Sequence, residues 1–452
     1  TLWRALFFGY QTHNYQPLLL EQLRTQPLAA LLSLAGTVLH DLWAVSFGAW
    51  ATVLSLPDPQ ALGGRTTQLY AGVVALTALL VFLVLMRLRT PPPTDAPQRS
   101  WALPAIGLGA AALLVAGWPF WLTQLPIGLI YPNNRFTLPF MLGASLLMAG
   151  LLRLLPLRRW MHLALLGIFV ALAVGVHFQS ANAYRRDWDV EKTLFWQMVW
   201  RMPQIEPGTA LLTNDLPTHY SSDNSLTAAL NWTYAPANRT QQMSYMLYYT
   251  TVRLNGTLQG LQPQVPIDQD YLAAAFHGNT SQVIALYFEP PGCLRVLDPQ
   301  LDAENQMIST LMRRAALLSR QDLIQSPESG QAAQPPAAVF GEEPAHGWCY
   351  YYEKADLARQ QKDWETVVAL GEQAFALGDY PNDPAERFPF IEGYAHTGNW
   401  SRALELSQES QDITPLMQPV LCRLWQRIET STPASAEKEA ALQAATAGLG
   451  CK

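Results

Sequence analysis

The stretch TQLYAGVVALTALLVFLVLM, residues 67–86, contains no charged side chain. A helix of about 20 apolar residues is long enough to cross the hydrocarbon core of a bilayer, so this stretch predicts a transmembrane helix. Four further segments of similar character surround it, and together they predict a polytopic α-helical membrane domain over residues 28–178. The five predicted spans lie near residues 28–56, 67–86, 101–122, 137–157 and 160–178.

The overall composition fits a membrane protein with a large soluble region. Charged residues make up 14% of the 452 residues, below the roughly 25% of ordinary globular proteins. Apolar residues gather in the membrane domain, whereas residues 179–452 have the composition of a soluble protein. The formal net charge is −6 and no basic run is present, which argues against nucleic acid as a partner. The lipid bilayer is the first expected partner.

Arginines are distributed unevenly among the short loops between the predicted spans. Two alternate loops are bracketed by several arginines, whereas each of the other two carries one, Arg65 or Arg135. Because cytoplasmic loops are enriched in Lys and Arg, the arginine-rich loops predict the cytoplasmic side of a plasma membrane. With five crossings, residues 1–27 are expected to be cytoplasmic or interfacial and everything after residue 178 extracytoplasmic. The arginines that decide this orientation are Arg87, Arg89, Arg99, Arg153, Arg158 and Arg159.

The residues after the last predicted span form a soluble region with several parts. Residues 179–204 have tryptophans at helical spacing and predict an amphipathic helix, which either lies on the membrane surface or packs on the soluble domain. Residues 205–325 predict an extracytoplasmic α/β domain, because runs of strand length alternate with helical periodicity. A linker rich in Pro, Gly and Ala follows at residues 326–345.

Polar side chains follow the first predicted strand of the α/β domain. The run GTALLTND, residues 208–215, ends in Asp215, and His219 and Asp223 come shortly after it. Ligand sites of α/β domains lie at the carboxyl ends of strands, so these three residues are a candidate acid/base or metal-binding group. Turns and helix caps explain aspartates at such positions equally well.

The C-terminal part of the chain has helical periodicity throughout. In residues 350–379, small and aromatic residues recur at the spacing of a helix pair, and IEGYAHTGNWSRALELSQES repeats the pattern. Residues 346–430 thereby resemble tetratricopeptide repeats, which stack helix pairs of about 34 residues. The resemblance implies a protein-binding surface around Trp364 and Trp400, and the alternative is a helical cap that stabilises the neighbouring domain. Residues 431–452 are expected to be a C-terminal tail.

Two ionisable residues, His40 and Asp41, lie inside the first predicted span. A charge at bilayer depth is costly and indicates a functional site by default, so the pair is a candidate intramembrane polar site. Adjacent residues of a helix point about 100° apart, and both can face one site only if the helix is broken. Alternatively, the span consists of two shorter pieces and the pair lies at an interface.

The sequence YPNNRFTLP, residues 131–139, opens the fourth predicted span. Its order of Arg, aromatic residue, two further residues and Pro resembles the late membrane segments of GT-C-class glycosyltransferases, which use lipid-phosphate-linked sugars. The resemblance implies that Arg135 meets the phosphate of a polyprenyl-phosphate sugar, to which a guanidinium offers a planar fork of donors. Tyr131 would hold the loop at interface depth. The alternative is an ordinary interfacial arginine at the start of a membrane helix.

The first predicted outer loop, residues 57–66, departs from the pattern of that family. The family carries catalytic acidic residues in its first outer loop, whereas this loop offers only Asp58. No catalytic residue, metal site or cofactor is therefore predicted within the chain. If the protein is such an enzyme, its catalytic half, with any divalent metal, is expected upstream of Thr1.

The four cysteines all lie in the soluble region. An even number of cysteines in an exported region permits disulfides, and buried free thiols are the alternative. No pairing follows from the spacing. The cysteines are Cys293, Cys349, Cys422 and Cys451.

Two functional hypotheses arise from different parts of the sequence. The multi-span layout and the Arg135 loop favour a GT-C-like glycosyltransferase fragment that acts with a lipid-phosphate-linked sugar at the outer face of the membrane. The helical repeats, together with the lack of a convincing catalytic set, favour a non-catalytic membrane-anchored scaffold that binds a protein partner outside the membrane.

Overall fold

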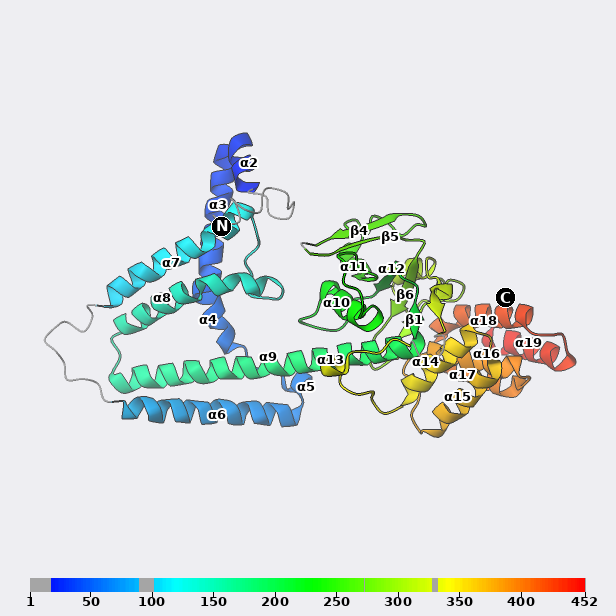
Figure 1. Cartoon of the computed structure of the whole chain (residues 1–452). Coiled ribbons are helices and arrows are strands. Elements are labelled where there is room, and N and C mark those ends of the chain that lie inside the picture. Colours follow the sequence, from blue (N-terminus) through cyan, green and yellow to red (C-terminus); the bar gives the residue numbers. More distant parts are fainter. Residues whose placement is uncertain (1–17, 89–100, 272, 327–331, 452) are drawn as a thin grey trace. The chain divides into compact units, whose positions relative to one another are not determined.

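The computed structural model describes residues 18–88, 101–271, 273–326 and 332–451 (Figure 1). The chain divides into two compact units, Thr1–Arg185 and Arg186–Lys452, and each is described by itself. Parts of several predicted regions lie outside the described residues: residues 1–17, the loop residues 89–100 with Arg89 and Arg99, residue 272 of the predicted α/β domain, residues 327–331 of the predicted linker and residue 452 of the predicted tail.

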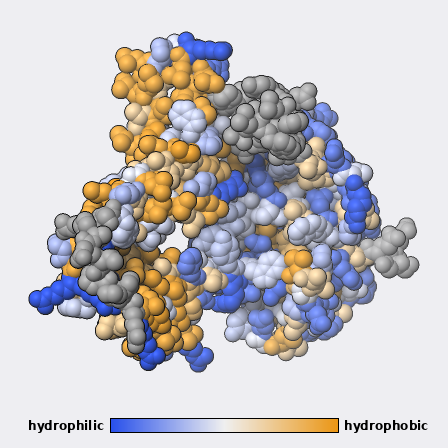
Figure 2. Space-filling view, turned by 60° about the vertical axis from the view of Figure 1, so that its left-hand side comes forward, coloured by the Kyte–Doolittle hydropathy of each residue, from blue (hydrophilic) through white to orange (hydrophobic). Residues whose placement is uncertain are grey.

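Five helices among the described residues are long and apolar enough to cross a membrane, which confirms the predicted number of apolar segments. Many of their large apolar side chains are exposed, for example Leu28 at 71% and Val115 at 75%. A soluble protein does not expose contiguous apolar surface on this scale, and Figure 2 shows that surface. The chain is therefore a membrane protein. The five helices are Pro27–Leu54, Gly64–Arg87, Ala102–Thr123, Asn133–Leu154 and Arg159–Arg201.

The first of these apolar segments changes its helical geometry along its length. A π-helical turn follows shortly after Asp41, and the segment ends in a 3-10 turn. Its parts are α3 (Pro27–Trp43), η2 (Ala44–Gly48), α4 (Ala49–Ala51) and η3 (Thr52–Leu54). The other helices that begin in this unit are α2 (Leu18–Thr25), α5 (Pro59–Leu62), α6 (Gly64–Arg87), α7 (Ala102–Thr123), η4 (Asn133–Phe140), α8 (Met141–Leu154) and α9 (Arg159–Arg201).

Small residues let α7 and α8 pack closely against each other. A Cβ atom at Gly143 of α8 would lie 2.9 Å from the carbonyl oxygen of Gly109 in α7. A Cβ atom at Gly150 would lie 2.9 Å from the carbonyl oxygen of Ala102, so later residues of α8 meet earlier residues of α7. The two helices are therefore antiparallel neighbours, held by the close backbone approach that small residues allow in lipid.

Helix α9 continues without a break from the fifth apolar segment into residues 179–201. The polar stretch that ends the apolar run contains neither Gly nor Pro, so nothing there stops a helix. Phe195 and Met198 are fully buried in the core of the second unit, and the ring of Trp188 stacks on Phe340 at 5.3 Å. Of the two alternatives for this amphipathic stretch, the structure shows the one in which it packs on the soluble domain.

A four-stranded sheet organises the first part of the second unit. The strand order is β3-β2-β6-β7, in which β2 runs parallel to both β3 and β6, and β7 runs antiparallel to β6. The register pairs Ala210 with Met246 on one side and with Val283 on the other. These strands are β2 (Ala210–Thr213), β3 (Met246–Tyr249), β6 (Val283–Tyr287) and β7 (Arg295–Val296).

Both faces of this sheet are buried, as expected for parallel strands. Leu211 and Ile284 contribute to one hydrophobic cluster, whereas Leu212 and Val283 contribute to another. Helices and short strand pairs surround the sheet. They are α10 (Asp223–Tyr234), α11 (Thr250–Arg253), α12 (Thr310–Ala316), η5 (Gln321–Leu323), β1 (Gln204–Ile205) paired with β8 (Ile324–Gln325), and β4 (Pro266–Asp270) paired with β5 (Ala275–Asn279).

The remainder of the second unit is a stack of helix pairs. The second helix of each pair begins with a side-chain cap, from Asp363, Asn399 or Ser435, as helix starts require. Residues 436–449 form a helix, although the sequence suggested a tail there. The elements are α13 (Ala337–Phe340), α14 (Trp348–Gln360), α15 (Trp364–Ala376), η6 (Pro384–Arg387), α16 (Phe388–His396), α17 (Trp400–Ile413), η7 (Pro415–Met417), α18 (Gln418–Ser431) and α19 (Ala436–Leu449).

Two disulfides cross-link the second unit. Cys293, just before β7, is bonded to Cys349 in α14, so the sheet region and the helix pairs are covalently joined. Cys422 in α18 is bonded to Cys451, which follows α19. Of the two alternatives that the sequence left open, the structure therefore shows disulfides rather than free thiols.

Candidate functional site

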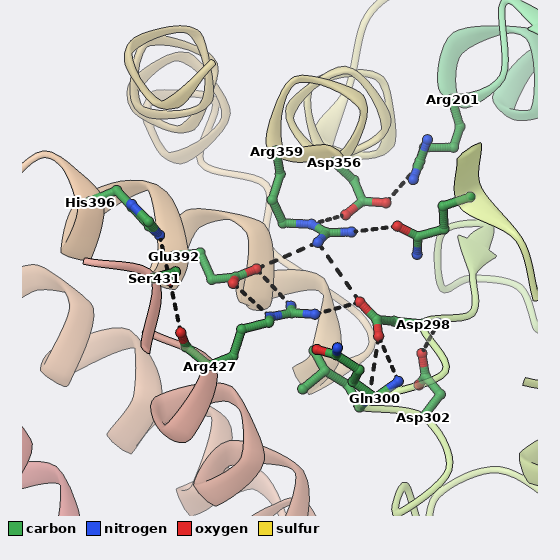
Figure 3. Close-up of polar contacts among 12 residues, drawn as sticks. Arg201, Asp298, Gln300, Asp302, Asp356, Arg359, Glu392, His396, Arg427 and Ser431 are labelled. Atoms are coloured by element: carbon green, nitrogen blue, oxygen red, sulfur yellow. Dashed lines mark hydrogen bonds and ion pairs between the residues drawn. The ribbon is translucent and has the colours of Figure 1, made fainter. Parts of the chain in front are cut away.

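Six charged residues meet where the loop after β7 contacts the helix pairs (Figure 3). They come from five separate segments of the chain, which the fold brings together from both parts of the second unit. Three are cationic and three are anionic, so their charges balance. We call them the ion-pair cluster, and they are Arg201, Asp298, Asp356, Arg359, Glu392 and Arg427.

Arg427 of α18 is the centre of one half of the ion-pair cluster. Its Nε and Nη2 atoms donate to the two carboxylate oxygens of Glu392, each at 2.8 Å, in the bidentate geometry that makes Arg–carboxylate pairs strong. Its Nη1 atom donates to Asp298 Oδ2 at 2.5 Å. One guanidinium therefore holds α16 and the loop after β7 together.

Asp356 of α14 is the centre of the other half. Its Oδ1 accepts from Arg359 Nε at 2.6 Å, and its Oδ2 accepts from Arg201 Nε at 2.5 Å. Burial by itself would raise the pKa of Asp356, but the two neighbouring guanidinium groups hold that pKa well below its usual value. Asp356 is therefore ionised at every pH at which the protein is expected to function.

Glu353, one turn before Asp356 on α14, is a residue that the sequence did not single out. Its side chain is fully buried, and neither carboxyl oxygen has a hydrogen-bond partner among the described residues. Burial raises its pKa well above the usual range, against the opposing effect of nearby Arg201. Nothing in the sequence around it distinguishes it from a surface glutamate on an ordinary helix.

Four members of the ion-pair cluster, all except Arg201 and Asp356, line an open cleft of about 420 Å³. Trp364, predicted to bind a partner, lines this cleft, and its ring is stacked on His396 at 3.8 Å. Trp400, the other predicted partner-binding residue, does not line the cleft, although both tryptophans are partly buried against the core of the helix pairs. The cleft is lined by Asp298, Pro299, Gln300, Ser319, Arg320, Gln321, Asp322, Arg359, Gln360, Lys362, Trp364, Glu392, His396, Arg427 and Ser431.

The electrostatics of this cleft depend on arginines and carboxylates that are already paired. Burial lowers the pKa of His396, and the nearby Arg427 lowers it further, while Glu392 opposes both. The imidazole is therefore neutral at pH 7 and offers a polar, uncharged edge beside the Trp364 ring. Such a cleft suits a polar ligand with an apolar face, such as a peptide side chain.

A second polar pocket, also of about 420 Å³, lies in the first unit. Asp41 is 3% exposed, and its Oδ2 accepts a hydrogen bond from Trp121 Nε1 at 3.0 Å. His40 Nδ1 lies 3.3 Å from Asp41 Oδ1, while most of the imidazole is exposed. His40 and Asp41 therefore line one pocket although α3 is unbroken at both residues, so the expectation that the helix must break was wrong. We call this second pocket the Asp41 pocket, and its other polar lining residues are Gln22, Ser33, Thr37 and Gln124.

The loop that carries Tyr131 and Arg135 adjoins the Asp41 pocket. Arg135 is exposed at the start of η4, with its Cζ atom 5.0 Å from the centroid of the Phe136 ring. The Phe136 ring lies 5.4 Å from that of Phe120, which itself lines the Asp41 pocket. Tyr131 is half-buried. The contact between Phe120 and Phe136 thus brings the Arg135 loop next to the Asp41 pocket. The sequence analysis had considered these two candidate sites separately.

The three candidate residues of the α/β region do not form one group. Asp215 Oδ1 accepts from the hydroxyl of Thr251 at 2.5 Å, and His219 Nδ1 lies 3.2 Å from Asp187 Oδ1. Asp223 is paired with the arginine at the end of α11 through two contacts of 2.5 and 2.6 Å. Over the described ranges, no group of three His, Cys, Asp or Glu side chains is arranged to hold a metal ion.

No protein-family model matches the chain, and no curated protein or solved structure matches it either.

Proposed function

We propose that the chain is the carrier-binding part of a polytopic glycosyltransferase that uses a lipid-phosphate-linked sugar at the outer face of the membrane. The observation that carries this proposal is the contact between Phe136 and Phe120, which places the exposed Arg135 loop beside the Asp41 pocket. A phosphate group and a sugar are adjacent in such a donor. In this chain an arginine adjoins a pocket lined by hydroxyl, amide and carboxylate groups. The arginine would contact the phosphate of such a donor, and the pocket would hold its sugar.

Arg135 supplies the group that would contact the phosphate. No ion pair to Arg135 occurs within the described ranges, and its guanidinium rests on an aromatic ring. A guanidinium bound to phosphate oxygens forms charge-assisted, bidentate hydrogen bonds. The Asp41 pocket would then receive the sugar, whose hydroxyls donate to and accept from the side chains of Gln22, Gln124 and Asp41.

Two independent features support a site of action at the outer face of the membrane. The arginine-rich loops indicate which ends of the apolar helices are cytoplasmic. The two disulfides of the second unit, Cys293–Cys349 and Cys422–Cys451, are of a kind that persists in oxidising compartments and is rare in the cytoplasm. Both features favour an extracytoplasmic position for the residues that follow the fifth apolar segment.

Arg135→Ala should weaken binding of a fluorescent polyprenyl-phosphate sugar to the purified chain by roughly 10- to 150-fold. This corresponds to the about 1.5–3 kcal/mol of hydrogen bonds to a charged group. Arg65→Ala is the matched control, because Arg65 is also exposed and lies in the first turn of α6, directly after the other arginine-poor loop. Arg135→Lys should bind with intermediate affinity, since it keeps the charge and loses the planar fork. Equal binding by the wild-type chain and Arg135→Ala would refute the role given to Arg135.

A second proposed function, a scaffold, is supported by the cleft at Trp364. The helix pairs α14–α15 and α16–α17 resemble tetratricopeptide repeats, and the cleft between them and the loop after β7 offers a tryptophan edge beside paired charges. Buried tryptophans at protein interfaces are frequent hot spots. In this proposal the cleft holds a side chain of a protein partner on the outer face of the membrane.

Trp364→Ala should weaken the affinity for a co-purifying partner roughly 30-fold or more, the effect of losing a hot spot of about 2 kcal/mol. Tyr380→Ala is the control, because Tyr380 is 72% exposed and does not line the cleft. The measurement is co-purification from detergent-solubilised native membranes, followed by a binding titration with the recovered protein. Undiminished recovery of the partner with Trp364→Ala would exclude the cleft as its docking site.

A further inference from the structure

Helices α7 and α9 indicate which residues of the first unit lie at the same side of the membrane. If α7, α8 and α9 cross in succession, then α7 and α9 run in the same direction. Each follows an arginine-rich loop, and the apolar stretch of α9 ends near Gln179. Gln124, directly after α7, and Gln179 are therefore both at the side opposite the arginines, which is the outer side.

Helix α6 is consistent with this assignment. A Cβ atom at Gly175 of α9 would lie 2.8 Å from the ring of Tyr70, and one at Gly167 would lie 3.7 Å from the carbonyl oxygen of Ala78. Later residues of α9 thus meet earlier residues of α6, so the two helices are antiparallel. The start of α6 consequently lies at the outer side, as does the short linker that precedes it.

Both ends of the first apolar segment contact residues at this outer side. At its C-terminal end, Gln179 Nε2 donates to the carbonyl oxygen of Ser55 at 3.3 Å. Just before its N-terminal end, Gln22 of α2 is paired with Gln124 through their side-chain amides, with Gln124 Nε2 2.5 Å from Gln22 Oε1. A helix that crossed the membrane would have its two ends at opposite sides. In Figure 1, α3 and α4 run transverse to α6 and the first part of α9.

We propose that the segment Pro27–Leu54 does not cross the membrane but lies along its outer surface. Its length supports this placement, because 28 helical residues extend about 42 Å, well beyond the roughly 30 Å of the hydrocarbon core. The inference is independent of the proposed function, since it concerns only the path of the chain. It changes the expected topology: α6, α7, α8 and α9 cross, and the described residues before Pro27, residues 18–26, are on the same side of the membrane as Gln179.

The two faces of α3 fit a helix at the boundary between lipid and water. Leu28, Leu32 and Leu39 are exposed at 71%, 68% and 70% and form the face that would enter the outer leaflet. Thr37 and Asp41, one turn apart, line the Asp41 pocket on another face. A helix with this division of side chains binds in the plane of the interface. Asp41 then avoids the cost of a carboxylate at the centre of the bilayer.

The decisive experiment compares the two flanks of the segment by cysteine labelling of the full chain in intact cells. Gln26→Cys and Gln60→Cys introduce thiols at exposed positions before and after the segment, and Leu155→Cys introduces one between α8 and α9. The wild-type chain, whose four cysteines are in disulfides, gives the background. A membrane-impermeant maleimide should label Gln26→Cys and Gln60→Cys equally and leave Leu155→Cys unlabelled until the cells are permeabilised.

Two other outcomes have clear meanings. Labelling of Gln60→Cys, with Gln26→Cys protected like Leu155→Cys, would show that the segment crosses and would overturn the proposal. A depth measurement provides the second readout, with nitroxides at Leu28, Leu32 and Leu39 of the chain reconstituted in vesicles. Collision with oxygen and with a water-soluble nickel chelate should place all three at one depth. A progressive difference of about 16 Å between Leu28 and Leu39, expected for an upright helix, would also overturn the proposal.

Discussion

Asp356→Ala should lower the free energy of unfolding of the second unit by about 3–5 kcal/mol, the cost of leaving a buried charge without its partner. The substitution removes the carboxylate that Arg201 contacts at 2.5 Å, and the Arg201 side chain is fully buried. Among the described residues, the one hydrogen bond that Arg201 then keeps is to the amide oxygen of Gln360, at 3.0 Å. Arg359 loses less, because Glu392 and Asp298 remain near it.

The loss of unfolding free energy caused by Asp356→Ala should be the same at pH 5 and pH 7. The pKa of Asp356 in the folded protein is lower than in the unfolded chain, so its stabilisation is fully present above the unfolded value of about 4 and is lost only as pH falls through the lower folded value. The measurement is urea unfolding of the full chain in mild detergent, followed by pulse proteolysis of residues 186–452.

An exposed ion pair that lines the cleft beside the ion-pair cluster gives a matched control. Arg320 and Asp322 form an ion pair with side chains that are 49% and 63% exposed. Asp322→Ala should cost less than about 1 kcal/mol, because exposed ion pairs are weak. Similar losses for Asp322→Ala and Asp356→Ala would show that the ion-pair cluster is not held in the buried geometry described above.

The membrane helices were predictable because their signal is local. The run at residues 67–86 became α6, Gly64–Arg87, since an uninterrupted apolar stretch has few alternatives to a helix in lipid. A membrane span ends where the apolar residues end, whereas a helix ends only where the sequence breaks it. The polar residues after Phe178 mark where lipid contact ends, but without Gly or Pro they let α9 continue to Arg201.

The C-terminal helix was missed for a related reason. Residues 436–449 are rich in alanine and glutamate, which favour a helix strongly. They lack the aromatic spacing of the preceding pairs, so the repeat pattern did not extend to them. Leu449 and Ala441 are nevertheless buried, and the third helix pair completes the core that two pairs alone would leave exposed.

The ion-pair cluster could not be predicted from the sequence, because its contacts join distant residues. Arg201 and Asp356 are 155 residues apart, and Asp298 and Arg427 are 129 residues apart. No local pattern distinguishes these side chains from solvated surface charges. Asp41, in contrast, could be predicted as a candidate site residue, because a carboxylate within an apolar stretch is rare and costly. The sequence identified the residue, but only the fold shows that Trp121 is its partner.

Replacing both Cys293 and Cys349 by serine should lower the free energy of unfolding of the second unit by about 2–5 kcal/mol. The bond closes a loop with a sequence separation of 56, compared with 29 for Cys422–Cys451. In the chain-entropy account each doubling of loop length adds about 0.6 kcal/mol, so the loss should exceed that of the Cys422→Ser/Cys451→Ser variant by roughly this amount. Pulse proteolysis of the full chain in urea measures both.

The Cys293–Cys349 bond should also affect the ion-pair cluster, because it holds the loop before β7 against α14. Without it, the region around β7 is held against the helix pairs by non-covalent contacts such as the one between Asp298 and Arg427. Hydrogen exchange in α14 should therefore rise more in the Cys293→Ser/Cys349→Ser variant than in the Cys422→Ser/Cys451→Ser variant. A reductant should destabilise the wild-type chain and leave a variant lacking all four cysteines unchanged. If a reductant instead leaves the wild-type unfolding midpoint where it was, the native protein carries free thiols, and the argument from disulfides to an oxidising compartment fails with them.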